Sequence, residues 1–241
     1  PDFLDEYAWL LYRNGKEQEA YRIWSDLLRK DPNRFTTLCN SGTALQIRGQ
    51  MEEAAKRIAK AAEQRPDFRS GAERWHARMI DYQIRMRAVP GYATQHLFID
   101  ELSPLWFGRK GFEELPEFPI EVTSQGIAEL LREFPTFGDG WVVLGMALER
   151  EGDAYSALAA YRRAIKHGTS QRGRIEGFLK ELEKKAYHDN PARRTARAMM
   201  KAIALVIGAA LFLFLFRFAS AIWSDVRESR NEKGGGRGGS R

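Results

Sequence analysis

Apolar residues recur at helical spacing over most of the chain and define helices of similar length. In the first two predicted helices they fall three or four positions apart, at Leu4, Tyr7, Ala8 and Leu11, then at Ala20, Ile23, Trp24 and Leu27. This spacing puts the apolar side chains of each helix on one face. Gly15 stands between the helices, where a C-terminal cap favours a residue without Cβ, and Pro32 follows the second helix as a stop. The pattern predicts a helical hairpin.

The hairpin pattern repeats along the chain, which is typical of a helical array. Gly15, Ala20, Leu27 and Pro32 recur 34 residues later as Gly49, Ala54, Ala61 and Pro66. Residues 1–68 therefore predict two hairpins, with Gly42 where two helices cross closely. A third copy in residues 138–168 has Trp141, Leu144, Gly145, Leu148, Gly152, Ala157, Tyr161 and Ala164 in register. Thr169 replaces the proline there.

This arrangement of small, glycine, alanine and proline positions in a 34-residue unit resembles the tetratricopeptide repeat (TPR) family. The resemblance implies an all-α solenoid of roughly three and a half hairpins, without a cofactor. It also implies a non-catalytic scaffold whose concave face binds a protein or peptide partner. From the repeat geometry we expect the exposed contact positions of the first two units to be Asp5, Arg13, Asn40, Thr43 and Ile47.

The middle of the chain, residues 69–122, departs from the repeat. Residues 69–87 predict one long helix, and residues 88–122 predict an irregular insertion with four prolines and three glycines. The insertion is rich in aromatic residues, among them Trp106, Phe107 and Phe112. Two interpretations are open. Either these three side chains form a partner-binding surface, or the insertion folds back and fills the core or the groove.

Residues 123–187 return to the helical pattern. Thr123–Phe134 predicts a second helix of a hairpin that pairs with the 138–168 unit. Residues 173–187 predict an amphipathic helix that covers the last apolar face, as the end of a repeat array requires.

A second pattern, continuous rather than periodic, begins near the C-terminus. Residues 202–223 are apolar except for Arg217, and as a helix they would extend about 33 Å, enough to cross a bilayer. We expect a single C-terminal transmembrane helix. Arg217 either reaches the headgroups or pairs with a partner helix, and Gly208–Ala210 would let such a helix approach.

The flanks of this segment are basic. Residues 188–201 predict a juxtamembrane linker and residues 224–241 a disordered basic tail. The membrane-flanking residues are Arg193, Arg194, Arg197, Lys201 and Arg217. They predict contact with the lipid bilayer. The sequence contains no signal peptide, which favours a cytoplasmic repeat domain; a leader removed from upstream of Pro1 would place that domain outside the cytoplasm.

The distribution of charged residues and the candidate metal-ligating residues limit the kinds of function that the sequence supports. Residues 184–241 carry 12 Lys and Arg against 4 Asp and Glu, and residues 1–183 carry 26 against 28. The repeat domain therefore lacks the basic character of a nucleic-acid-binding domain. The single cysteine, Cys39, and the separated histidines indicate no metal site. The competing hypothesis is an enzyme or enzyme subunit whose site lies in residues 88–122, with His96, Asp100 and Arg109 converging in a pocket.

Overall fold

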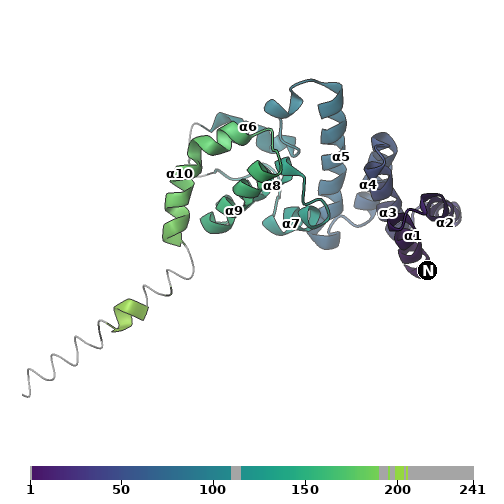
Figure 1. Cartoon of the computed structure of the whole chain (residues 1–241), viewed down its shortest axis with the longest axis horizontal. Coiled ribbons are helices and arrows are strands. Elements are labelled where there is room, and N and C mark those ends of the chain that lie inside the picture. Colours follow the sequence, from purple (N-terminus) through teal and green to yellow (C-terminus); the bar gives the residue numbers. More distant parts are fainter. Residues whose placement is uncertain (1, 110–114, 190–194, 196–198, 204, 206–241) are drawn as a thin grey trace, which may run out of the picture. The chain divides into compact units, whose positions relative to one another are not determined.

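The computed structural model describes residues 2–109, 115–189, 195, 199–203 and 205. The chain divides into two compact units, residues 1–187 and residues 188–241. The described part of the first unit consists of α-helices and short 3-10 helices joined by loops, without a strand (Figure 1). The predicted all-α class is confirmed.

Three continuous helical hairpins share one geometry. They are α1 (Asp2–Arg13) with α2 (Glu17–Lys30), α3 (Phe35–Ile47) with α4 (Met51–Gln64), and α8 (Gly138–Arg150) with α9 (Ala154–Lys166). The ends of α1 and α3 lie 34 residues apart, as do the starts of α2 and α4. Each hairpin turns at a glycine with positive φ, at 78° for Gly15, 79° for Gly49 and 82° for Gly152. The turn requires the left-handed conformation that glycine adopts without steric cost.

Small residues let the two helices of a hairpin approach each other. A Cβ on Gly42 of α3 would lie 2.7 Å from Ile58 of α4, and a Cβ on Gly145 of α8 would lie 2.6 Å from the Tyr161 ring of α9. Both distances are below any real Cβ contact. The close crossing expected at Gly42 is therefore present, and the last hairpin repeats it.

A fourth hairpin is split by the insertion. Helix α5 (Ala72–Ala88) packs on α4 and on α7 (Ser124–Glu133), and α7 packs on α8 as well. The helix predicted over 123–134 thus exists, but it pairs with α5 in addition to the 138–168 hairpin. The helix predicted from residue 69 begins instead at Ala72. A 3-10 turn, η1 (Phe68–Gly71), precedes it, and Arg69 and Ser70 have φ of 50° and 57°.

The insertion between α5 and α7 is folded into the core. It forms η2 (Tyr92–Thr94), η3 (Asp100–Leu102) and α6 (Ser103–Gly108). Leu97, Ile99, Leu102 and Trp106 are at most 1% exposed and belong to the same apolar cluster as α8 and α9. Trp106 stacks on Tyr161, and its indole N–H donates to Gln171 at 3.0 Å. The interpretation in which the insertion folds back onto its own chain is correct for this side chain.

Buried hydrogen bonds and a buried ion pair connect the insertion and α5 to the last hairpin. The carboxylate of Asp139 on α8 accepts hydrogen bonds from Tyr82 of α5 at 3.0 Å and from Thr169 and Ser170 after α9. Arg109 forms an ion pair of 2.9 Å with Glu149 of α8, and both side chains are at most 5% exposed. Buried charges are tolerated when they are paired in this way.

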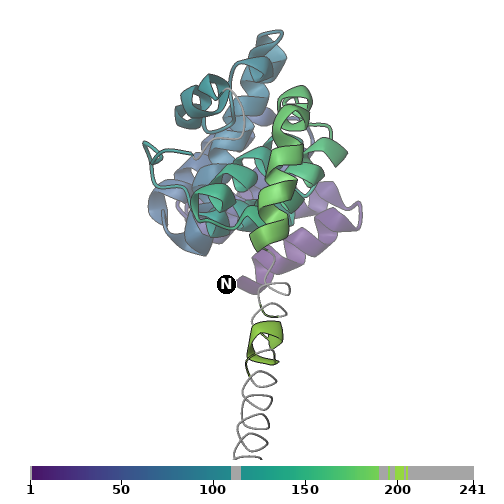
Figure 2. The same ribbon diagram turned by 90° about the vertical axis from the view of Figure 1, so that its left-hand side faces the viewer.

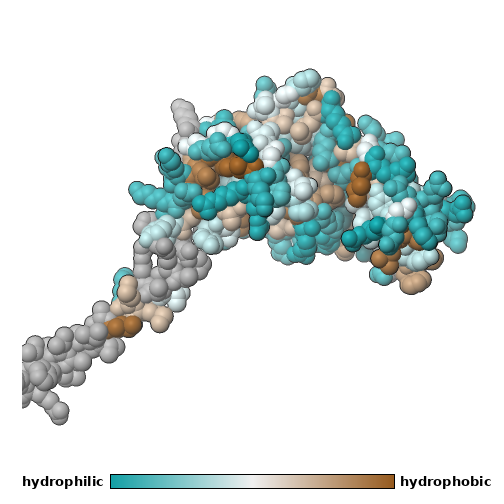
Figure 3. All heavy atoms as spheres, viewed as in Figure 1, coloured by the Kyte–Doolittle hydropathy of each residue, from teal (hydrophilic) through white to brown (hydrophobic). Residues whose placement is uncertain are grey.

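The last described helix of the unit is α10 (Arg172–Asp189), which lies across the final hairpin (Figure 2). Ile175, Phe178 and Leu182 are buried, and Phe178 packs edge-on against Tyr161 of α9. The predicted capping helix is therefore present. Hydrophilic side chains cover most of the visible surface, and apolar atoms gather in small patches, one of them beside α4 (Figure 3).

Most of the predicted membrane segment, residues 202–223, lies outside the described residues, as do Arg193, Arg194, Arg197 and Arg217. Lys201 is described, and its side chain is exposed. Within the part of the chain that the structure describes, no helix combines the length and apolar character needed to cross a membrane.

The close approach at Gly145 makes a direct test of the hairpin packing. We expect Gly145→Ala to destabilise the fold by about 1–3 kcal/mol, because the added methyl group overlaps the Tyr161 ring. The thermal unfolding midpoint, measured by circular dichroism, should fall by several degrees.

Gly177→Ala in α10 is the matched control, since no atom lies within 4 Å of its added Cβ. There the higher helix propensity of alanine should leave the midpoint unchanged or raise it slightly. Equal midpoints for the two variants would contradict the tight crossing of α8 and α9.

Candidate functional site

Among the described residues, a groove lies between α1, α3, η1, the start of α5 and the end of α7. Its volume is about 680 Å³. It is lined by Trp9, Arg13, Phe35, Thr36, Cys39, Asn40, Thr43, Ile47, Phe68, Arg69, Glu73, Arg132, Glu133 and Phe134. Its walls carry both aromatic and polar side chains, and no described residue of the 88–122 insertion is among them.

Four of the five contact positions expected from the repeat geometry line this groove. They are Arg13 on α1 and Asn40, Thr43 and Ile47 on α3. Ile47 is 62% exposed, although it is apolar. The 34-residue offset brings these residues together because it puts equivalent positions of successive helices on one face.

Asp5 is the exception, and the expectation that it is exposed is wrong. Its side chain is fully buried, pairs with Arg34 at 2.8 Å and accepts a hydrogen bond from Thr37 at 2.7 Å. Both partners belong to the start of α3, where a carboxylate is also favoured by the helix dipole. Asp5 therefore joins α1 to α3 and lies away from the groove.

Of the three aromatic residues proposed as a partner-binding surface, the structure describes Trp106 and Phe107, and both pack against the core. Trp106 is fully buried, so it is not available to a partner in this structure. Phe107 is partly buried and packs against the core, with the guanidinium of Arg174 5.4 Å from its ring centre. Phe112 lies outside the described residues.

A series of buried polar side chains lies next to the groove and begins at Glu73. Glu73 of α5 is 6% exposed, and His76, one turn further on, is 2% exposed. The His76 Nε2 lies 2.6 Å from Gln46 Oε1, and Gln46 donates to Gln83 at 3.1 Å. Burial first, and the neighbouring charge of Glu73 second, raise the pKa of the Cys39 thiol far above its usual range. Such a thiol is a poor nucleophile at neutral pH.

Arg69 of the η1 turn connects this turn to helix α7, and both elements line the groove. Its guanidinium pairs with Glu129 at 3.4 Å and more closely with Glu133, both on α7. Burial lowers the pKa of Arg69, but the bonds and charges of Glu133, Glu73 and Glu129 outweigh it, so the pKa stands above its ordinary value. A Cβ on Gly126 of α7 would collide with the carbonyl oxygen of Ser70. The turn at residues 69–70 thus rests directly on α7.

Glu73 and Arg69 line the groove but were not predicted from the sequence. The signal for Glu73 was the same 34-residue offset, because it stands 34 positions after Cys39, which lines the groove from α3. Nothing in the local sequence indicates the left-handed turn at Arg69, since it depends on the distant helix α7.

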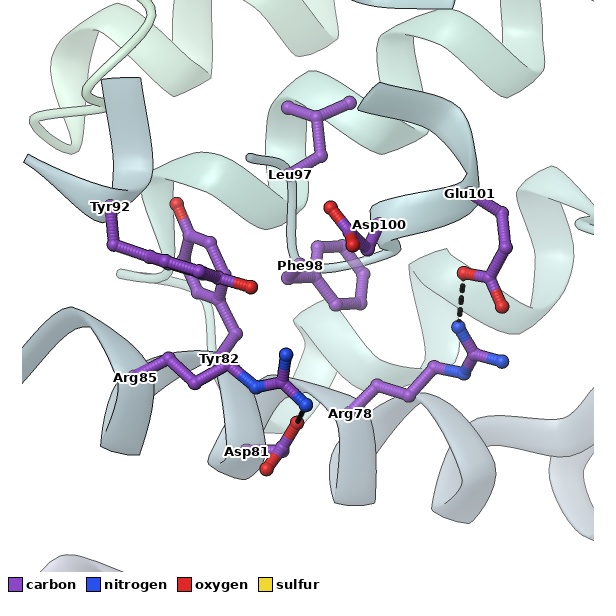
Figure 4. A pocket seen from close by; sticks show the side chains of 9 residues that line it. All are labelled: Arg78, Asp81, Tyr82, Arg85, Tyr92, Leu97, Phe98, Asp100 and Glu101. Carbon is purple, nitrogen blue, oxygen red and sulfur yellow. Dashed lines mark hydrogen bonds and ion pairs between the residues drawn. The ribbon is translucent and has the colours of Figure 1, made fainter. Parts of the chain in front are cut away.

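A second cleft lies between α5 and the insertion and has a volume of about 500 Å³ (Figure 4). Its arginines face carboxylates, Arg78 with Glu101 and Arg85 with Asp81. Asp100 also lines it; burial raises the pKa of this carboxyl, but hydrogen bonds from His96 and Ser103 outweigh burial and hold the pKa below its usual value. The charges of this cleft are therefore largely compensated within the chain.

The competing enzyme hypothesis requires His96, Asp100 and Arg109 to lie together, and only the first two do. His96 contacts Asp100 at 2.7 Å and stacks on Tyr92 at 4.2 Å. Arg109 is instead paired with Glu149 inside the core and does not line the cleft. Within the described ranges, no group of three or more His, Cys, Asp or Glu side chains is placed to hold a metal ion.

Because Cys39 is the only cysteine of the chain, its reactivity reports on the groove. We expect iodoacetamide to alkylate it at least about tenfold more slowly in the folded protein than in urea, at the same pH. The raised pKa leaves little thiolate when the chain is folded, and unfolding removes the burial that causes the shift. Mass spectrometry of the alkylated protein over time measures both rates.

Glu73→Gln serves as the control for the electrostatic part of this effect. Its alkylation should be faster than that of the unchanged protein, because one negative charge beside the thiol is gone, yet slower than in urea. A folded-state rate equal to that of the unfolded chain would contradict the buried position of Cys39.

A comparison of the sequence with models of known protein families found no match, and a comparison with proteins of curated function found none either. No function therefore comes to the groove from a relative. What the groove can bind follows from its own lining: apolar and aromatic walls, polar side chains on α3, and charged side chains on α1, α5 and α7.

Proposed function

We propose that this chain is a membrane-tethered scaffold of TPR-like hairpins whose groove binds a polypeptide segment of a partner protein. The observation that carries the proposal is that the described part of the 88–122 insertion, residues 88–109 and 115–122, contributes no residue to the lining of the groove. An array that filled its own concave face would have no place for a partner.

The lining suits a polypeptide ligand. Asn40, Thr43 and Thr36 offer hydrogen-bonding groups along α3, while Trp9 and Phe35 offer apolar surface beside them. A bound peptide needs both, because its backbone groups lose water on binding and must be paired again, and its side chains supply the apolar area. The volume of about 680 Å³ is large enough for a few side chains.

A non-catalytic role is part of the proposal. The enzyme alternative required His96, Asp100 and Arg109 to converge, and Arg109 is held in a buried ion pair with Glu149. The only thiol has a raised pKa, which disfavours covalent chemistry.

The proposal of a membrane tether is based on the sequence of residues 202–223 and of its basic flanks. Fifteen residues from Ala202 to Phe216 carry no charge, which favours insertion into a bilayer. We infer that the segment anchors the chain in a membrane and that the basic flank, including Lys201, contacts anionic headgroups.

Groove binding is tested by panning a random peptide display library on the full chain in detergent micelles. We expect the selected peptides to lose at least about tenfold in affinity for the Ile47→Asp variant, measured by fluorescence anisotropy. The substitution puts a charge on an apolar side chain that is 62% exposed in the groove, so it perturbs the ligand contact and spares the core.

Leu10→Asp is the matched control, because Leu10 is 57% exposed on α1 and does not line the groove. Its peptide affinity should equal that of the unchanged chain. If no peptide is enriched, or if the two variants bind alike, the groove is not the binding site.

The tether is tested by placing lysines in the apolar segment. Leu211→Lys, Leu213→Lys and Leu215→Lys together should release the chain from the membrane pellet after alkaline carbonate extraction, since each lysine near the bilayer centre costs about 2.5–3.5 kcal/mol. The same number of lysines in the tail, at Ser229, Asn231 and Ser240, should leave the chain in the pellet. Retention of the first variant would contradict membrane insertion.

A further inference from the structure

We propose that the groove recognises a basic side chain, lysine or arginine, of the bound segment and that Glu73 is its acceptor. The inference deepens the proposed function and rests on it, because it names the chemistry of the segment that the same groove binds. It is carried by one carboxylate that lines the groove, is buried, and has only long contacts to cationic or ring nitrogens.

Glu73 is nine-tenths buried and yet weakly compensated. Its carboxylate oxygens lie 3.7 Å from His76 Nδ1 and 4.0 Å from Arg69 Nη1, both beyond hydrogen-bond length. Two other buried carboxylates behave differently. Asp5 and Glu149 each have an arginine nitrogen within 2.9 Å. The neighbouring Cys39 thiol, which hydrogen-bonds to the Glu73 carboxylate, is neutral. Because a buried charge without a close cationic partner is costly, a charged donor from a ligand would stabilise the Glu73 carboxylate.

The charge balance on this wall of the groove also favours a cation. Arg69 and Arg132 face three carboxylates, those of Glu73, Glu129 and Glu133. Arg69 makes its closest pair with Glu133, and Arg132 pairs with Glu129 at 3.0 Å. On this wall one negative charge is therefore left over, and Glu73 is the carboxylate farthest from an arginine nitrogen. A single lysine or arginine from the ligand would balance the charges of this wall.

The surrounding rings fit the stem of such a side chain. Phe134 lies over His76 with 4.6 Å between ring centres, next to Glu73, and Phe35 and Phe68 form another wall. Long basic side chains pack their methylene groups on apolar surface, and their charged ends are attracted to aromatic faces. The chain already makes this contact with itself, since the guanidinium of Arg65 lies 4.7 Å from the centre of the Phe35 ring.

Arg13 restricts the charge of the ligand residues that can bind beside it. It lines the same groove from α1, is exposed, and has no ion-pair partner within 4.0 Å among the described residues. A run of basic residues would be repelled there, whereas an acidic or neutral residue would be accepted. The groove therefore selects for one basic residue beside uncharged or acidic ones, and against a polybasic segment.

The experiment uses the peptides that the display library yields against the full chain in micelles. We expect most of them to carry one lysine or arginine at a fixed position among apolar residues. Replacing that residue by norleucine should reduce the affinity about tenfold or more, the range of a hydrogen bond to a buried charge. This test changes only the peptide, so it does not depend on the folding of a variant.

The protein side is tested by Glu73→Gln, which keeps the shape and removes the charge. It should bind the lysine peptide and the norleucine peptide with equal affinity, because the two changes remove the same contact. Glu52→Gln, on the exposed face of α4 outside the groove, is the matched control and should keep the tenfold preference for lysine.

Two results would overturn the inference in distinguishable ways. Peptides that require Ile47 but carry no basic residue, or that keep their lysine preference in Glu73→Gln, leave groove binding intact and refute the role of Glu73. Failure to enrich any peptide refutes the proposed function and the inference with it.

Discussion

The groove depends on the contact between the turn at residues 69–71 and helix α7. Arg69 and Ser70 adopt left-handed backbone conformations that cost free energy in residues with a Cβ, and the cost is offset where Arg69 pairs with Glu129 and Glu133. Gly126 lets the two backbones meet, since any larger residue would collide with the Ser70 carbonyl. Because α7 supplies one wall of the groove and the turn supplies another, loss of this contact would open the site on two sides.

The insertion makes that contact possible although it separates α5 from α7 in sequence. A 35-residue connection between the two helices of a hairpin would carry a large entropic cost if it were unstructured. Here Leu97, Ile99, Leu102 and Trp106 are buried in the core of the last hairpin, which offsets that cost. The insertion thus acts as part of the scaffold, and its Trp106 packs against Tyr161 of α9 and Phe178 of α10.

The repeating hairpins could be predicted from the sequence because their determinants are local. Gly15, Gly49 and Gly152 mark turns that only a few neighbouring residues define. Trp106 and Asp5 could not be assigned in the same way, since their burial is decided by residues 65 and 32 positions away, Gln171 and Thr37. Sequence pattern therefore located the groove through α1 and α3, whereas its far wall, built by α5 and α7 across the insertion, needed the structure.

The position of Glu73 in the repeat accounts for the role proposed for it. Asp5, Cys39 and Glu73 stand 34 residues apart, at the same place in three successive hairpins. Asp5 is neutralised by Arg34 and the start of α3, and Cys39 carries no charge because burial raises the pKa of its thiol. At Glu73 the nearest arginine, Arg69, precedes it by four residues and lies closer to Glu133. The turn that forms one wall of the groove therefore also leaves the buried Glu73 carboxylate, which lines the groove, without a close arginine.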